Sequence, residues 1–139
     1  MVRAVAHARG VTVDLRPLQE RVARIGADIT IHIAVPRFDQ STARATLELM
    51  DMLLTGSSHV QAQYAEDGSL PGVTIYLERS GRRGPITFMG TPSGYELEAL
   101  VHALECWSRP DQTPFQTSYR QLLGEIAEDL RSDLFVAPT

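Results

Sequence analysis

The segment Ile29–Val35 constrains the fold most, because its isoleucines and valine alternate with smaller or polar residues until Pro36. This period of two, built from β-branched residues, predicts a strand that buries its isoleucine face. A helical pattern follows, with Ser41 or Thr42 as N-cap and an apolar side made of Ala43, Leu47, Met50 and Leu54. Alternation then returns at 59–64. A strand, a helix and a strand in this order predict a right-handed crossover between parallel strands.

A second group of elements follows Pro71. Alternating apolar residues from Val73 to Leu77 predict a strand, residues 80–84 a turn, and residues 85–89 an antiparallel partner strand. Ser93 and Glu96 have capping-box spacing before a helix with the apolar stripe Leu97, Leu100, Val101 and Leu104.

The two ends of the chain also contain helical patterns. Residues 15–25 predict a helix after a short N-terminal tail, with Asp14 as N-cap and Gly26 as its stop. A linker from Arg109 precedes a terminal helix over 118–130, which is followed by a short apolar segment at 134–136.

Composition excludes several classes of function. A chain of 139 residues with net charge −4 predicts one globular domain and argues against nucleic-acid binding, which needs clustered positive charge. All 13 basic residues are arginine, so no lysine can form a Schiff base or serve a Walker-type phosphate loop. The single cysteine, and the lack of a leader or membrane-spanning pattern, predict a cytoplasmic protein that binds no membrane. The four histidines lack zinc-site spacing and no glycine-rich nucleotide motif is present, so we expect no metal and no cofactor.

The order of elements is typical of a thioredoxin-like three-layer α/β sandwich, with a mixed sheet made of a βαβ unit, a β-hairpin and a helix, and with helices on both faces. The stretch 84–97, continuing through 100–104, resembles the N-terminal module of the flavoprotein component of alkyl hydroperoxide reductase. It also resembles the tandem glutaredoxin-like protein disulfide oxidoreductases. The resemblance covers the chain from about Leu15 to Thr139. These proteins carry two thioredoxin folds in series, and in the flavoprotein the first fold lacks the redox cysteines.

The resemblance implies a division of the chain. Residues 1–108 correspond to a thioredoxin-like domain without the Cys-x-x-Cys motif, and residues 109–139 to a linker helix and the start of a second such fold. Residues 134–139 resemble the strand that leads into the second fold's cysteines. Two interpretations stay open: a piece of a longer reductase, or a free-standing degenerate relative.

The resemblance places Phe38 and Ser41 where the two redox cysteines would stand, and neither residue can form a disulfide. The plainer interpretation is a simple helix entry, and the alternative is a peptide or partner groove formed by Pro36, Phe38 and Pro71. The family geometry also implies that Pro71 is cis and packs near Phe38.

Cys106 and His102 suggest a different chemistry, because residues four apart are neighbours on a helix. A nearby His⁺ can lower a thiol pKa, but the C-terminal end of a helix disfavours a thiolate. A surface or interface cysteine is the plainer interpretation. Arg82 and Arg83 could hold a phosphate or carboxylate, although arginines in an exposed turn are usually only solvated.

We therefore expect a non-catalytic thioredoxin-like module that supports and docks a dithiol-bearing domain or redox partner protein. Two alternatives are a free-standing monothiol oxidoreductase that uses Cys106 with His102, and a homodimeric binding protein without a redox role. We also expect a homodimer, in which residues 134–136 of each chain pair with the other.

Overall fold

The computed structural model of the chain describes residues 5–8, 11–37, 40–109, 121 and 124–126. Its central sheet has the strand order β4-β3-β5-β6, in which β3 (Ile29–Val35) lies parallel to β4 (Val60–Glu66) and antiparallel to β5 (Thr74–Arg79). The fourth strand, β6 (Arg82–Met89), is antiparallel to β5. The predicted parallel crossover and the hairpin are both confirmed, and the sheet is mixed as expected.

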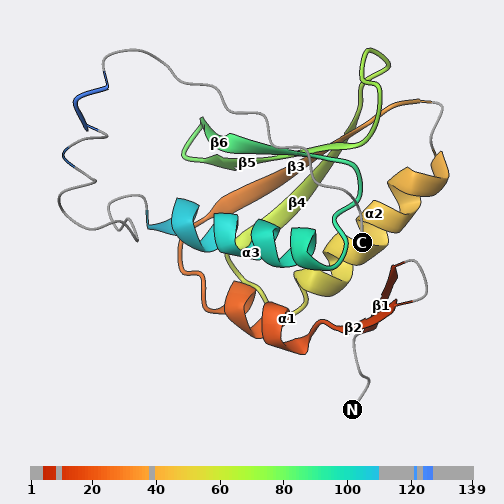
Figure 1. Cartoon of the computed structure of the whole chain (residues 1–139), viewed down its shortest axis with the longest axis horizontal. Helices are drawn as coiled ribbons and strands as arrows, with labels where there is room; N and C mark the ends of the chain where they lie inside the picture. The colour runs from red at the N-terminus through yellow and green to blue at the C-terminus, as the bar shows by residue number, and fades with distance from the viewer. Residues whose placement is uncertain (1–4, 9–10, 38–39, 110–120, 122–123, 127–139) are drawn as a thin grey trace.

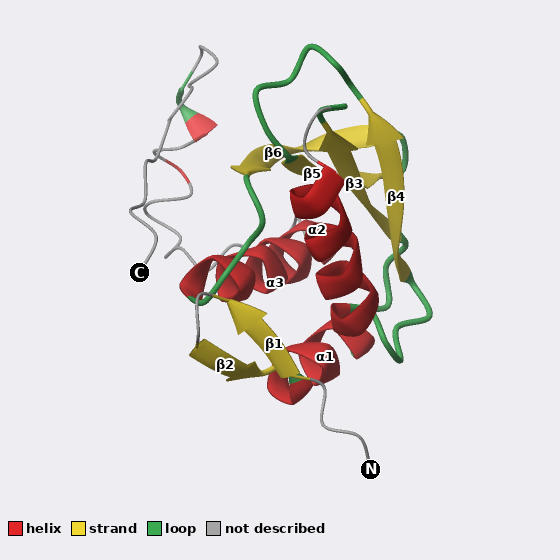
Figure 2. Ribbon diagram, turned by 90° about the vertical axis from the view of Figure 1, so that its right-hand side faces the viewer, coloured by secondary structure: helices red, strands yellow, loops and turns green. Residues whose placement is uncertain are grey.

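Three helices are described. They are α1 (Arg16–Ala23), α2 (Gln40–Leu53) and α3 (Tyr95–Ser108). All three lie on the same side of the sheet, and α1 packs against both α2 and α3 (Figures 1 and 2). The thioredoxin-like α/β class is confirmed, but helices do not cover both faces in the described part of the chain. The loop that joins β4 to β5 is short, so no described helix reaches the other face.

The isoleucines of β3 point toward the helices, as their spacing predicts. Ile29, Ile31, Ile33 and Val35 are at most 1% exposed, whereas the residues between them are only partly buried. On α3 the predicted stripe of Leu97, Leu100, Val101 and Leu104 is buried in full. The predicted face of α2 is only partly right, because Leu47 and Leu54 are half-buried while Thr46, Leu49 and Leu53 enter the core.

The chain begins with a hairpin that the sequence patterns did not predict. Strands β1 (Val5–Ala8) and β2 (Val11–Asp14) form a separate two-stranded antiparallel sheet. Each strand has four residues, which is too short for alternation to stand out from a tail. The predicted terminal helix at 118–130 and the segment at 134–136 lie outside the described residues, apart from 121 and 124–126.

The predicted caps of all three helices are wrong. Helix α1 begins after Leu15, and the Asp14 carboxylate instead accepts the Arg16 N–H at 3.1 Å. Ser41 and Thr42 lie inside α2, which begins at Gln40. Gly94 precedes α3 with a φ of 56°, a conformation that favours glycine, and this shifts the start of the helix past Ser93.

The hairpin between β5 and β6 turns at Ser80 and Gly81, both of which have positive φ. This is the backbone of a two-residue hairpin turn that matches the twist of the strands. Arg82 and Arg83 therefore pair within β6, opposite Arg79 and Glu78, and the predicted five-residue turn is wrong. None of the helices in the described part of the chain is both long and apolar enough to cross a membrane.

Candidate functional site

The connection between β3 and α2 is the place where the resemblance puts a redox site. Val35 and Pro36 are buried, and Arg37 is exposed. The side-chain amide of Gln40 donates to the Arg37 carbonyl at 3.1 Å. Ser41 is exposed in the first turn of α2, where a helix N-terminus would stabilise a thiolate if a cysteine stood there. The hydroxyl of Ser41 cannot take part in thiol exchange, and Phe38 lies outside the described residues.

A loop at 67–70 lies beside this connection. The Asp67 N–H donates to the Val35 carbonyl at 2.9 Å, and a Cβ at Gly68 would lie 3.8 Å from Cδ of Arg37. The Asp67 carboxylate accepts hydrogen bonds from the Ser69 hydroxyl at 2.6 Å and the Ser69 N–H at 3.0 Å. These bonds hold the pKa of Asp67 below its ordinary value. The loop is thus closed by its own polar groups against the end of β3.

The prediction that Pro71 is cis is wrong. The described chain contains no cis peptide bond, and Pro71 itself is exposed. The Leu70–Pro71 bond has the ordinary trans isomer, and the Leu70 N–H donates to the Asp67 carbonyl at 3.3 Å in the turn before it. The expected contact of Pro71 with Phe38 falls outside the described residues. Of the three predicted groove residues, Pro36 is buried and Pro71 faces solvent.

A pair of threonines stabilises the same end of the sheet, and sequence reasoning missed it. Thr46 is 0% exposed, and its hydroxyl donates to the Thr42 carbonyl at 2.8 Å. The same oxygen lies 2.6 Å from Thr91 Oγ1, so the Thr91 hydroxyl must act as the donor in that bond. This contact joins α2 to the segment before α3. A polar residue within the apolar stripe of α2 was the signal for it.

Cys106 is exposed in the last turns of α3. Its Sγ lies 3.6 Å from His102 Nε2, as the helical spacing predicts. His102 Nδ1 lies 4.0 Å from Glu105 Oε1, and the same oxygen of Glu105 binds Arg21 Nη2 at 2.5 Å. The thiol therefore has one imidazole neighbour, whose other nitrogen faces a carboxylate already paired with an arginine.

Cys106 and the β3–α2 connection lie at opposite ends of the sheet. The end of β6 pairs with Thr74, which in turn pairs with Ala34 near the end of β3. Helix α3 then runs back along the sheet, and its last carbonyls are bound by Arg79 at the far end of β5. The structure does not bring the cysteine to the position that the resemblance marks as a redox site.

The helix-free face of the sheet has a stacked aromatic group that the sequence analysis did not identify. The rings of His32 and Tyr76 stack with centroids 4.7 Å apart, and the Arg83 guanidinium lies 4.1 Å from the Tyr76 centroid. Arg83 also donates to Thr87 Oγ1 at 3.1 Å. Arg83 is therefore packed on the sheet, whereas the sequence suggested a solvated turn residue.

No group of three or more histidine, cysteine, aspartate or glutamate side chains capable of holding a metal occurs in the ranges that the structure describes. His59 Nδ1 instead pairs with Asp28 at 2.9 Å, and His32 Nε2 lies 3.5 Å from Glu78 Oε2. That no metal or cofactor takes part stays a prediction.

The sequence matches no protein-family model and no curated protein. Among solved structures it is similar to the alkylhydroperoxide reductase protein AhpF of Enterococcus faecalis (TM-score 0.64, 16% identity, covering 77% of this chain and 56% of that one). The N-terminal domain of AhpF from the same organism gives a TM-score of 0.64 at 15% identity, again covering 77% of this chain and 56% of that one.

A protein disulfide oxidoreductase from Aeropyrum pernix is also similar, with a TM-score of 0.62 at 21% identity over 85% of this chain and 58% of that one. This chain thus spans a little over half the length of the structures it matches. The resemblance stated from the sequence is confirmed at the level of the fold. The chain has the thioredoxin-like fold found in these reductase and oxidoreductase structures.

Proposed function

We propose that this chain is a non-catalytic thioredoxin-like module of a thiol-disulfide or peroxide reductase system, which supports and docks a dithiol-bearing domain or partner. One observation carries the proposal. The chain has the thioredoxin-like fold, yet Ser41 stands in the first turn of α2 and the single thiol lies at the other end of the sheet. A dithiol cycle needs two sulfurs within bonding reach. This connection contains none.

Exposed apolar side chains support the docking part of the proposal. Met89 is 70% exposed at the end of β6, and Tyr95 is 83% exposed at the start of α3. Ile86, in the same edge strand, is 49% exposed. An edge strand presents unpaired N–H and C=O groups, and such apolar neighbours favour a protein partner. The proposed occupant is a dithiol-bearing thioredoxin-like fold.

The catalytic half of the proposal is tested by insulin disulfide reduction with dithiothreitol as the electron source. We expect the chain and its Cys106→Ser variant to give the same rate as buffer. Acceleration by the chain would contradict the non-catalytic role. If Cys106→Ser abolished that acceleration, the activity would be assigned to the monothiol.

Self-association tests the docking half, because an unsatisfied docking face can bind a second copy. We expect sedimentation velocity at tens of micromolar to show a homodimer, and Met89→Glu with Tyr95→Glu to shift it toward monomer. A chain ending at Arg131 tests the contribution expected from residues 134–136. If the full chain runs as a monomer at these concentrations, the exposed surface does not pair with itself and the homodimer is contradicted.

The second candidate function is a monothiol oxidoreductase, and the 3.6 Å contact of Cys106 Sγ with His102 Nε2 favours it. Such an enzyme would attack a glutathionyl mixed disulfide with the Cys106 thiolate and release the substrate thiol, and glutathione would then regenerate Cys106 and leave as glutathione disulfide. A glutathionylated peptide with excess glutathione separates the two functions. Turnover that is lost in both Cys106→Ser and His102→Gln supports the enzyme, and turnover at the buffer rate supports the docking module.

A further inference from the structure

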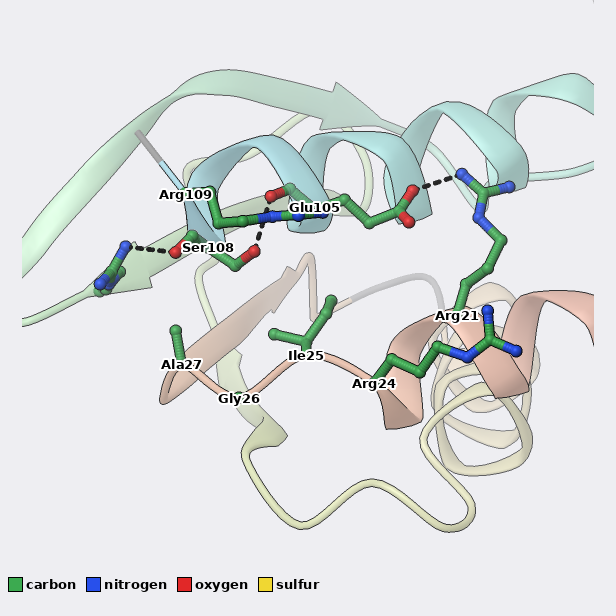
Figure 3. A pocket seen from close by; sticks show the side chains of 9 residues that line it. Arg21, Arg24, Ile25, Gly26, Ala27, Glu105, Ser108 and Arg109 are labelled. Carbon is green, nitrogen blue, oxygen red and sulfur yellow. Dashed lines mark hydrogen bonds and ion pairs between the residues drawn. The ribbon is translucent and has the colours of Figure 1, made fainter. Parts of the chain in front are cut away.

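A pocket of about 640 Å³ opens at the amino end of β3, opposite the β3–α2 connection. Its walls come from the end of α1, the segment before β3, the end of β5 and the last turn of α3 (Figure 3). Its volume falls within the range of small-molecule sites, roughly 300–1,000 Å³. Neither the proposed docking role nor the thiol chemistry of Cys106 uses this pocket.

The pocket concentrates positive charge in a protein that is acidic overall. Among the described residues, Arg21, Arg24, Arg79 and Arg109 line it, and Glu105 is the only acidic residue of that lining. The whole chain has a net charge of −4, so these four of its 13 arginines create a local field of opposite sign. Arg21 lies in α1 and Arg79 in β5, whereas Arg24 and Arg109 directly follow α1 and α3. The four were therefore not recognisable as a cluster in the sequence.

Two of the arginines are held in place. Arg79 Nη1 donates to the carbonyls of Trp107 and Ser108, at 3.0 and 2.8 Å, and so neutralises part of the negative end of α3. Arg21 pairs with Glu105, and this bond raises the pKa of Arg21. Both guanidinium groups therefore keep their charge and position at the pocket.

The other two arginine side chains have no described bonding partner. Arg24 and Arg109 are exposed, and neither side chain makes a hydrogen bond or ion pair with any residue that the structure describes. Figure 3 shows Arg24 beside Arg21 on one wall and Arg109 along α3 on another. A guanidinium offers several N–H donors in a planar fork that matches carboxylate and phosphate oxygens. The pocket therefore has cationic donors on two walls without a described acceptor.

We infer that this pocket binds a small anion with at least two negative groups, one facing Arg24 and the other facing Arg109. Carboxylates and phosphates share the required chemistry, because both accept paired hydrogen bonds from guanidinium. A ligand with a single negative group would bind only one of the two walls, so a ligand with two such groups should bind more tightly. The inference does not depend on the proposed function, since the two sites lie at opposite ends of the sheet.

Titration calorimetry at low ionic strength tests the inference with citrate, inorganic pyrophosphate and acetate as probes. We expect citrate or pyrophosphate to bind, acetate to bind at least tenfold more weakly, and the stronger of the two multivalent probes to identify the preferred group. Arg24→Gln and Arg109→Gln should each weaken binding about fivefold. The matched control is Arg44→Gln, which removes the same charge from an exposed position on α2. An equal loss in all three variants, or no binding of either multivalent probe, would overturn the inference.

Glu105 gives a test of opposite sign. Its carboxylate occupies Arg21 and opposes an anion in the pocket, so Glu105→Gln should tighten binding of the same probe about threefold. Glu48→Gln removes the same charge from α2 and should leave the affinity unchanged. Thermal unfolding of each variant shows that it is folded. Weaker binding in folded Glu105→Gln would contradict a pocket in which this carboxylate opposes the bound anion.

Discussion

The two ends of the sheet are built on different principles. At the carboxyl end of β3, buried Pro36 and the neutral Thr46–Thr91 bond stabilise a connection with no thiol. At the amino end, Arg21 pairs with Glu105, Arg79 binds the end of α3, and Cys106 lies in the last turns of that helix. The resemblance places redox chemistry at the carboxyl end of β3, where the connection has no thiol, while the charged groups and the cysteine gather at the other end. A shared architecture therefore does not say where the chemistry of a chain lies.

The largest expected effect concerns the buried apolar stripe of α3, which both ends of the sheet share. Leu97, in the first turn of α3, lies near the carboxyl end of β3 and is 2% exposed. Leu104, later in the same helix, lies toward the amino end of β3 and is 0% exposed. Leu97→Ala and Leu104→Ala should each lower the free energy of unfolding by about 3 kcal/mol. Urea denaturation measures both. A loss below about 1 kcal/mol in only one of them would show that the core is loosely packed at that end. The two ends of the sheet would then differ in packing, not only in their polar contacts.

The charged end is tested by Arg79→Met, which keeps the aliphatic length and removes both bonds to the carbonyls of Trp107 and Ser108. Because bonds from a charged donor are lost, the free energy of unfolding should fall by about 1.5 kcal/mol. Urea denaturation at about 0.05 and 0.5 M NaCl should give a smaller loss at high salt. Arg82→Met, at an exposed position in the same hairpin, is the control and should change stability little.

The neutral end is tested by Thr46→Val, which keeps the shape of the side chain and removes the bonds to Thr42 and Thr91. We expect a loss of about 1 kcal/mol in the free energy of unfolding. Unlike the loss in Arg79→Met, it should be the same at both salt concentrations. A marked salt dependence would contradict a neutral contact at this end.

The smallest expected effect is a pH dependence at the loop beside the β3–α2 connection. The pKa of Asp67 lies below its ordinary value of 3.8 because Ser69 donates two hydrogen bonds to the carboxylate. The stabilisation is therefore present above that pH and lost as the pH falls through the lower pKa of the folded state. The midpoint of thermal unfolding at pH 7 should fall slightly in Asp67→Asn, and the difference between the two proteins should disappear as the pH falls below the pKa of Asp67 in the folded state. A constant difference at all pH values would show that the charge of Asp67 is not involved.

The parts of the fold that follow a local period were predictable. Alternation identified β3, and the helical spacing of Leu97, Leu100 and Leu104 identified α3, because burial on one face imposes these periods on neighbouring residues. The four-residue strands β1 and β2 were missed because so short an alternation carries little signal.

The site was harder to predict because its contacts join residues far apart in the chain. Thr46 and Thr91 are 45 residues apart, and Arg21 and Glu105 are 84 apart. No local pattern encodes such pairs. The cis assignment of Pro71 came from the resemblance, not from its neighbours, and the trans bond before Pro71 contradicts it.

Restoring the missing thiols tests the central claim most directly. If the β3–α2 connection keeps the thioredoxin-like framework and lacks only its sulfurs, Phe38→Cys with Ser41→Cys in a Cys106→Ser background should create a dithiol at the start of α2. We expect this variant to reduce insulin disulfides well above the buffer rate, while Phe38→Cys alone and Ser41→Cys alone stay at that rate. A folded double variant that shows no activity and forms no disulfide between residues 38 and 41 would contradict the claim that this connection lacks only the two cysteines of a redox site.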